Sequence, residues 1–414
     1  MLQHFLCPLL LLLCISSTES TPPPPIATTE GALSPPQPCG VNSSLQILTV
    51  DSSWLTPEAV FDSSTGRLHV VYGTTSKDAF YTSMMGDGTW TSSIKLNTAG
   101  LQVTTTMGER GPKLAMSTSA GHLVVVWADL WTGAGCRVYA RSVFSTDNGV
   151  TWSSPLIFAP NLFGIDGLAV TAYHQTVVAT FHVNISSLPI QNASSATWLH
   201  YVISLNGGVS WGLPSIIKDV NDDEATAIAC SMCMTSPHFD QSTGTLFIAY
   251  RSAENNIRDF RLVQAKDAQI NSFETINFGT QWRIPYCPMN GPELSINVAT
   301  METIAYMTGD ENNVFWIQRN TSSGNFTRPR GTPNREPNER SASAVTSRNG
   351  GDTLLAYNVG PMAVSGDAAV KYACYAYGNE TAQQAGELGR SFAGTKPSVL
   401  ALSAQSLLII TTAV

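Results

Sequence analysis

The chain has 414 residues and a formal net charge of −8 at pH 7, and only 13% of its residues are charged. An acidic chain with so few charges is a poor partner for nucleic acid or for an anionic membrane surface, so we exclude both.

The N-terminal residues 1–20 are predicted to be a signal peptide. The run from Phe5 to Ile15 is apolar but too short to span a bilayer, and small residues follow it. Residues 21–44 are rich in Pro and Thr and are predicted to form an extended linker. Residues 45–414 are expected to form the folded domain of a secreted protein without a transmembrane segment.

One pattern recurs along this domain: a Pro or small residue, an apolar pair, a polar turn and an alternating apolar strand. The copies lie at Pro57–Tyr72, Pro112–Trp127, Asp166–Phe181, Pro237–Tyr250, Pro292–Tyr306, Ser343–Tyr357 and Pro397–Thr411. Period-2 alternation marks strands, and two more strands fit between successive pairs. The pattern predicts an all-β fold, a single β-propeller of seven four-stranded antiparallel blades. The strand Leu45 to Val50 is expected to complete the seventh blade and close the ring.

Two octapeptides have the residue types of one particular β-turn. In Ser145 to Trp152, the Ser and Asp side chains can bond the turn's own amides, and Gly149 supplies a positive φ. Ser204 to Trp211 repeats the pattern with Asn in place of Asp, and Ser83 to Trp90 is a degraded third copy. The positions expected to build these turns are Ser145, Asp147, Gly149, Trp152, Asn206, Gly208 and Trp211.

These octapeptides resemble the Asp-box, or BNR repeat, of the sialidase-like superfamily. Propellers of that superfamily usually have six blades, so six is the alternative count. The segment from Ala229 to Glu293 resembles more narrowly a family of secreted bacterial BNR-repeat proteins, with a Cys-rich loop, a YR…NxRD loop and a CPxxGP loop. The resemblance implies a shared site on one face of blades four and five, and it implies no particular reaction.

Propeller connectivity sorts the loops onto two faces. Loops that enter the first strand of a blade share one face with loops between the second and third strands, around the central channel. The polar and Cys residues expected there include Glu109, Arg110, Asp129, Trp131, Cys136, Arg137, Asp166, Asp310 and Glu311. Because arginine pairs suit an anionic group, the predicted ligand-binding residues are Arg251, Glu254, Arg258, Asp259 and Asn290. The alternative is that these arginines only pin a loop.

Six cysteines remain after the signal peptide, and an even number outside the cell favours disulfides. We expect Cys287 to pair with Cys230 or Cys233, and the leftover thiol to pair with Cys136. Cys39 and Cys374 are expected to form the remaining bridge. A thiolate metal site at Cys230, Cys233 and Cys287, with His238 nearby, is the less favoured alternative, so we predict neither a metal nor a cofactor.

Six N-x-[ST] sequons fit passage through a glycosylating secretory pathway. They are Asn42, Asn184, Asn192, Asn320, Asn325 and Asn379.

A sialidase requires several arginines for the substrate carboxylate, a Tyr nucleophile with a Glu, and an Asp acid/base. The stretch Trp282 to Pro285 looks like the F/Y-R-I-P motif that carries the first such arginine, but it follows both octapeptides and is interpreted as a decoy. We therefore expect a secreted, monomeric propeller that binds a glycan or an extracellular protein on its channel face. The alternative is an exo-acting, sialidase-type glycoside hydrolase with a rearranged arginine site.

Overall fold

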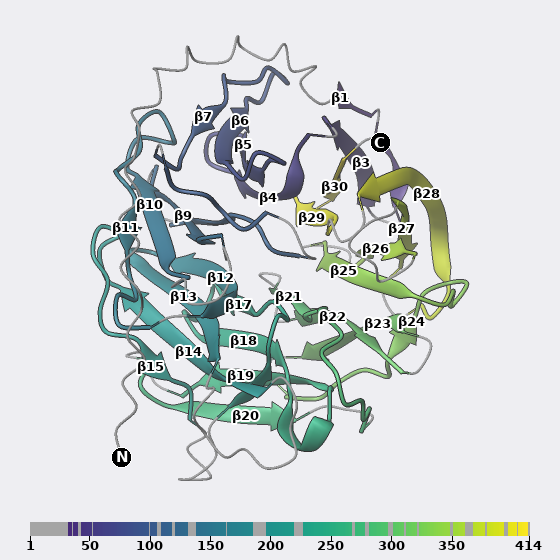
Figure 1. Ribbon diagram of the computed structural model, residues 1–414. Helices are drawn as coiled ribbons and strands as arrows, with labels where there is room; N and C mark the ends of the chain where they lie inside the picture. Colours follow the sequence, from purple (N-terminus) through teal and green to yellow (C-terminus); the bar gives the residue numbers. More distant parts are fainter. Residues whose placement is uncertain are drawn as a thin grey trace.

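Each of the seven predicted strand pairs forms the two innermost strands of one blade, and the blades circle a central axis (Figure 1). In this computed structural model the all-β propeller and the count of seven blades are confirmed, and the alternative of six is wrong. The structure describes residues 32–412 except 35, 40–42, 52, 99, 106–108, 118–120, 131–137, 163, 185–195, 219–226, 267–269, 278–280, 297–300, 310–311, 321–322, 348–350, 361–366, 377–378, 393–395 and 404.

The first three blades follow one another in the chain, and each runs from the axis outward. Blade one holds β4 (Leu55–Asp62), β5 (Arg67–Gly73), β6 (Ala79–Met84) and β7 (Ile94–Lys95). Blade two holds β8 (Lys113–Met116), β9 (Leu123–Ala128), β10 (Ala140–Ser145) and β11 (Leu156–Ile157). Blade three holds β12 (Ile165–Tyr173), β13 (Thr176–Asn184), β14 (Ala196–Ser204) and β15 (Ser215–Ile216), and β14 also pairs with β16 (Ile228–Cys230).

Blades four to six repeat the same order. Blade four holds β17 (Ser236–Phe239), β18 (Leu246–Arg251), β19 (Phe260–Ala265) and β20 (Phe273–Asn277), with a short 3-10 turn, η1 (Glu254–Asn256), after β18. Blade five holds β21 (Glu293–Ile296), β22 (Met301–Thr308), β23 (Asn313–Asn320) and β24 (Arg330–Gly331). Blade six holds β25 (Glu339–Thr346), β26 (Thr353–Val359), β27 (Asp367–Tyr375) and β28 (Ala382–Phe392).

Both ends of the described chain build blade seven. The C-terminal β29 (Ser398–Ala401) and β30 (Ser406–Thr412) are its inner strands, and β3 (Ser43–Val50) pairs with β30 in parallel. Two short strands, β1 (Ala32–Leu33) and β2 (Gln37–Cys39), pair with β3. The predicted closing strand is therefore observed, and it is the third strand from the axis because it pairs with β30. It is not the outermost strand, since β1 and β2, from residues assigned to the linker, pair with its other edge.

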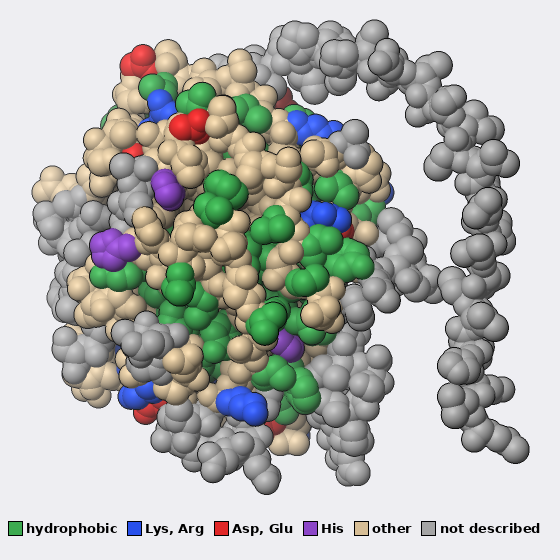
Figure 2. Space-filling model, turned by 90° about the vertical axis from the view of Figure 1, so that its left-hand side faces the viewer, with side chains coloured by type: hydrophobic (Ala, Val, Ile, Leu, Met, Phe, Trp, Pro, Cys, Tyr) green, Lys and Arg blue, Asp and Glu red, His purple; other side chains and the backbone are tan. Residues whose placement is uncertain are grey.

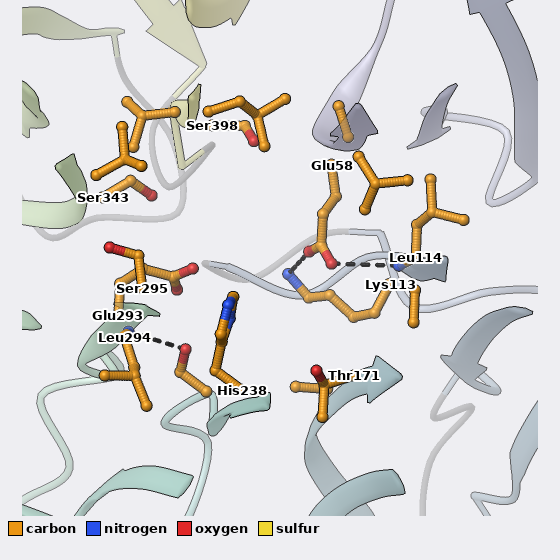
Figure 3. A pocket seen from close by; sticks show the side chains of 18 of the residues that line it. Glu58, Lys113, Leu114, Thr171, His238, Glu293, Leu294, Ser295, Ser343 and Ser398 are labelled. Atoms are coloured by element: carbon orange, nitrogen blue, oxygen red, sulfur yellow. Dashed lines mark hydrogen bonds and ion pairs between the residues drawn. The ribbon is translucent and has the colours of Figure 1, made fainter. Parts of the chain in front are cut away.

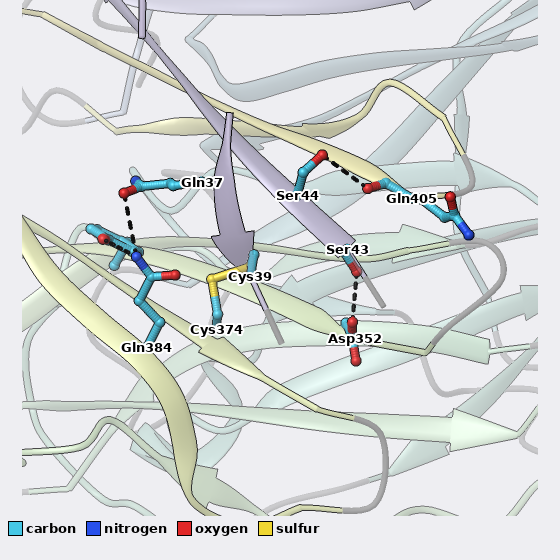
Figure 4. Close-up of a disulfide and its surroundings, with 9 residues drawn as sticks. Gln37, Cys39, Ser43, Ser44, Asp352, Cys374, Gln384 and Gln405 are labelled. Atoms are coloured by element: carbon cyan, nitrogen blue, oxygen red, sulfur yellow. Dashed lines mark hydrogen bonds between the residues drawn. A yellow bond between two sulfur atoms is a disulfide. The ribbon is translucent and has the colours of Figure 1, made fainter. Parts of the chain in front are cut away.

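A disulfide adds a second closure. Cys39 on β2 is bonded to Cys374 on β27, which links blade seven to blade six as predicted (Figure 4). Around it, Ser43 Oγ donates to Asp352 Oδ2 at 2.7 Å, and Ser44 Oγ donates to the Gln405 carbonyl at 3.2 Å. The two ends of the chain are thus tied to the ring by backbone pairing, side-chain hydrogen bonds and one covalent bond.

Strand β9 shows why the inner strands are apolar on both sides. Its residues Leu123, Val125 and Trp127 pack in the cluster shared with blade one. The alternate residues Val124 and Val126 pack in the cluster shared with blade three. Successive side chains of a strand point to opposite faces of its sheet, so a strand between two neighbouring blades buries every residue.

The first predicted Asp-box turn joins β10 to β11 and attaches blade two to blade one. Ser145 Oγ accepts from the Gly149 amide at 2.8 Å, and Asp147 Oδ1 accepts from the Thr151 amide at 2.9 Å. On blade one, Tyr81 Oη donates to the Asn148 carbonyl at 3.2 Å. The rings of Tyr81 and Trp152 lie 4.9 Å apart, so the half-buried Trp152 packs between blades.

The second predicted turn, between β14 and β15, attaches blade three to blade two in the same way. Ser204 Oγ accepts from the Gly208 amide at 2.9 Å, and Asn206 Oδ1 accepts from the Ser210 amide at 2.9 Å. Trp211 Nε1 donates to Ser142 Oγ at 3.0 Å, and its ring stacks on Phe158 at 4.9 Å. The two turns therefore work as connectors between successive blades.

The side of the disc that carries the outer strands of blades two and three is poor in charge, with scattered apolar patches (Figure 2). Large hydrophobic residues exposed in the two turns and beside them are Val150, Leu156, Leu205, Val209 and Leu213. No helix of the described chain is long and apolar enough to cross a membrane.

Candidate functional site

The innermost strands of all seven blades surround one central channel with a volume of about 530 Å³. The wall consists of residues from β4, β8, β12, β17, β21, β25 and β29. Ser295, Ser343, Ser398 and His238 present their side chains to this space (Figure 3). A cavity of this size is in the range of ordinary small-ligand sites.

Charged side chains in the channel wall are paired between different blades. Lys113 Nζ lies 2.7 Å from Glu58 Oε2, and the Leu114 amide donates to the other oxygen of Glu58 at 3.2 Å (Figure 3). Lys396 forms an ion pair with Glu293. Burial alone would lower the pKa of Lys396, but the charges of Glu293 and Glu109 outweigh it and raise the pKa.

We call the end of the channel at which the innermost strands begin the upstream end, and define it by Glu109, Arg110, Asp166, Asn290 and Lys396. Glu109 is buried there, and it accepts from Asn290 Nδ2 at 2.8 Å and from the Gly291 amide at 3.3 Å. Burial raises the pKa of Glu109, and the charge of Lys396 opposes the rise. Arg110 Nε donates to Asp166 Oδ1 at 2.7 Å. The predicted gathering of Glu109, Arg110, Asp166 and Asn290 on one face is therefore observed.

Arg340 contributes a buried cation near this end. Arg340 is 7% exposed, and its Nε and Nη2 atoms have no hydrogen-bond partner among the described residues. Burial lowers the pKa of Arg340, and the charge of Glu109 opposes the change. A guanidinium with unused donors is the natural partner of an oxygen-rich ligand.

The two arginines predicted to bind ligand are structural in this fold. Arg251 is 1% exposed, and its guanidinium donates to the carbonyl oxygens of Asn290 at 2.6 Å, Met307 at 2.9 Å and Arg258. Arg258 is 0% exposed, and its Nε donates to the Tyr286 carbonyl at 3.0 Å. Because neither guanidinium is open to solvent, the structure favours the loop-pinning alternative over direct contact with a ligand.

The other predicted ligand-binding residues also serve the loops around η1. Asp259 accepts from the amides of Gln281 at 2.8 Å and Trp282 at 3.2 Å. Glu254 forms an ion pair with Arg261. Arg283, in the motif interpreted as a decoy, is exposed and donates to the Asn255 carbonyl at 2.8 Å. Only Asn290, through Glu109, belongs to the channel's upstream end.

Cys230, Cys233 and Cys287 lie together, but they are not bonded in the structure. All three are buried free thiols, and their Sγ atoms lie within 4.8 Å of one another. The predicted bridge from Cys287 to Cys230 or Cys233 is therefore not observed. His238 does not join the group, because its side chain lines the channel (Figure 3).

Several predicted residues fall outside the described part of the chain: Trp131, Cys136, Arg137, Asp310, Glu311, Asn42 and Asn192. Of the remaining sequons, Asn184 ends β13, Asn320 ends β23, and Asn325 and Asn379 are exposed. Attachment of glycans at the sequons stays a prediction.

The residues of the channel wall were not predicted from the sequence. Glu58, Lys113, His238, Glu293 and Ser398 each follow the proline that opens a repeat. A polar residue at that position of an otherwise apolar strand was the available signal. The importance of these five positions is visible only when the blades bring them together around one axis.

Comparison with known proteins shows which fold this chain shares with solved structures, but it assigns the chain to no family. No protein-family model matches the chain, and no curated protein matches its sequence. Among solved structures, the BP39L lectin of Burkholderia pseudomallei superposes with a TM-score of 0.52 at 9% identity, over 83% of this chain and 93% of the lectin. A polysaccharide lyase, the PL25 ulvan lyase bound to -[GlcA(1-4)Rha3S]-, gives 0.51 at 10% identity, over 87% of this chain and 88% of the lyase.

A sialidase of Trypanosoma rangeli is also similar, with a TM-score of 0.47 at 11% identity, over 79% of this chain and 55% of that enzyme. The structural neighbours thus include lectin, lyase and sialidase propellers. At this level of identity the likeness concerns the propeller fold alone.

Proposed function

We propose that this protein is a secreted, monomeric propeller that binds a carbohydrate in its central channel, at and below the upstream end. The observation that carries the proposal is the wall of the channel of about 530 Å³, where hydroxyl, carboxylate and ammonium groups converge from different blades. Sugars present many hydroxyl groups that both donate and accept hydrogen bonds. A wall that offers both kinds of group at fixed positions suits such a ligand.

The fixed ion pairs strengthen this assignment. Glu58 and Lys113 hold each other in place across two blades, as do Glu293 and Lys396. Carboxylate and ammonium groups that are already oriented make charge-assisted hydrogen bonds to a ligand at little further entropic cost. The lectin and the ulvan lyase named above are sugar-directed proteins on the same fold, which supports the compatibility of the scaffold with this function.

The alternative of a sialidase-type hydrolase has less support. Its chemistry requires a tyrosine nucleophile and a cluster of arginines that face the substrate. Among the described residues that line the channel there is no tyrosine. Arg251 and Arg258 are committed to carbonyl oxygens. We therefore favour a carbohydrate-binding function over a sialidase-type hydrolase.

A channel-filling substitution tests the proposal. Ser295→Phe and Ser398→Phe each put a ring into the channel, so binding of the best oligosaccharide from a glycan array should weaken at least tenfold, which is about 1.4 kcal/mol. Titration calorimetry gives the affinity. Ser215→Phe, on the exposed outer strand β15, is the matched control and should bind like the unmodified protein.

The array contains neutral, uronic-acid and sulfated oligosaccharides. Absence of binding to all of them, or equal affinity of the two channel variants and the control, contradicts a channel site. Turnover of a fluorogenic sialoside, abolished by the same two substitutions, would instead favour the hydrolase.

A further inference from the structure

A cluster of three thiols lies beside the upstream end of the channel and is not used by the proposed glycan site. We call Cys230, Cys233 and Cys287 the thiol cluster. Cys233 and Cys287 have their Sγ atoms 3.5 Å apart. Two thiolates on one tetrahedral cation, each about 2.3 Å from it, lie roughly 3.8 Å apart. Sulfurs in a disulfide are about 2.0 Å apart. The spacing therefore matches ligands of a shared cation more closely than a bonded pair.

The loops that carry the sulfurs keep their shape without a bond between them. His182 Nε2 lies 2.9 Å from the Cys233 carbonyl oxygen, and Arg251 Nε donates to the Asn290 carbonyl at 2.6 Å. Met232 and Met289 adopt left-handed backbone conformations, with φ of 64° and 51°. Such conformations are unfavourable for a non-glycine residue, and they persist where the surroundings impose them.

The positive charge of the Arg251 guanidinium near the thiol cluster favours an anionic form of the cluster. Arg251 is buried, and among the described residues the acceptors bonded to its guanidinium are the backbone carbonyl oxygens of Asn290, Arg258 and Met307. Its positive charge acts on both Cys233 and Cys287. A buried cation without a counter-charge is costly. Thiolates held by a metal ion would place negative charge near this buried guanidinium.

The donor atoms determine which cations fit. The side chains of Met232 and Met289 pack against the cluster, which adds two soft thioether sulfurs to its surroundings. No described His, Asp or Glu joins the three thiols within the same distance. Soft sulfur ligands select soft cations over Mg²⁺ or Ca²⁺.

We propose that Cys230, Cys233 and Cys287 form a three-thiolate site for one soft d¹⁰ metal cation, Cu(I) or Zn(II). On binding, each thiol releases its proton to solvent, its sulfur donates an electron pair to the metal, and the metal keeps its oxidation state. Three sulfurs complete a trigonal Cu(I) site, whereas Zn(II) takes a fourth ligand. Competition between the two ions therefore distinguishes them.

The test uses the full-length secreted protein, prepared without oxygen and with metal content measured by mass spectrometry. Cu(I) or Zn(II) is added, and affinity is measured against a chelator of known strength. We expect one equivalent of one of these ions. Cys230→Ser and Cys287→Ser should each weaken affinity at least 100-fold. The double substitution Cys39→Ser and Cys374→Ser is the matched control, because it removes two cysteines outside the cluster and should retain the metal.

Two results would overturn the site. One is a disulfide between any two cysteines of the cluster in unreduced peptides of the native protein. The other is a metal content below about 0.1 equivalents per protein for both Cu(I) and Zn(II) while all three thiols are free, because a structural site should hold about one equivalent. If the serine variants fail to fold, metal content and the competition between Cu(I) and Zn(II) on the unmodified protein decide, since these measurements need no cysteine change.

Discussion

His69 illustrates how one buried side chain makes the stability of the propeller depend on pH. The residue is 0% exposed, its Nδ1 lies 2.7 Å from Tyr81 Oη, and its Nε2 has no partner among the described residues. Burial, assisted by the charge of Arg67, lowers the pKa of His69 to about 4, and Asp62 opposes the change. Protonation would place a charged N–H in the core without an acceptor.

We therefore expect the free energy of unfolding to rise with pH between about 4 and 6.5. In this window the unfolded chain binds the proton and the folded chain does not, so acid favours unfolding. The full contribution of His69 is about 3 kcal/mol, present above pH 6.5 and lost as the pH falls towards 4.

Urea unfolding at a series of pH values measures the effect. His69→Gln should flatten the curve in this window. An unchanged slope in His69→Gln would assign the acid sensitivity to other groups.

At the scale of the element, the two predicted Asp-box turns attach blade two to blade one and blade three to blade two. Gly149 has a φ of 81°, and a Cβ atom at this position would lie 2.2 Å from Tyr81 Oη. Gly88, in the degraded third copy, has a φ of 84° and open space around the same position. The two glycines therefore share a backbone conformation and differ in contact with a neighbouring blade.

This pair predicts two different losses of stability. Gly88→Ala should lower the free energy of unfolding by about 1 kcal/mol, from backbone strain alone. Gly149→Ala should lower it by roughly 2–4 kcal/mol, because the added methyl also displaces Tyr81. Chemical denaturation of both variants measures the difference, and equal losses would mean that the contact between blades contributes nothing.

At the scale of the whole molecule, stability depends on closing the ring. The parallel pairing of β3 with β30 joins the two ends of the described chain, and the Cys39–Cys374 disulfide joins residues 335 positions apart in sequence. Without these contacts the sheet edges and apolar faces of blades six, seven and one would be open to solvent.

Deletion of residues 397–414 should therefore prevent folding. The double substitution Cys39→Ala and Cys374→Ala should leave a folded propeller that is less stable by roughly 2–5 kcal/mol, since the ring is then closed by hydrogen bonds and packing alone. Circular dichroism during heating tests both expectations. A cooperative transition at the normal temperature in the truncated chain would show that six blades suffice.

The sequence by itself determined the seven blades, their strands and the turns that join them. These features are local, because period-2 alternation and turn chemistry depend only on residues that are consecutive in sequence, such as 123–128 and 145–152. The pairing of Cys39 with Cys374 was also predicted from the sequence, as the pair left over once the other four cysteines had been assigned.

Only the tertiary structure decided the roles of the polar residues. Glu58 lies on a predicted strand and Arg251 was expected in a loop on the channel face, yet Arg251 is buried against carbonyl groups and Glu58 lines the channel. Cys233 and Cys287 meet as free thiols because two loops from different parts of the chain are packed against each other. Burial and partners depend on how blades converge, which residue type and spacing do not specify.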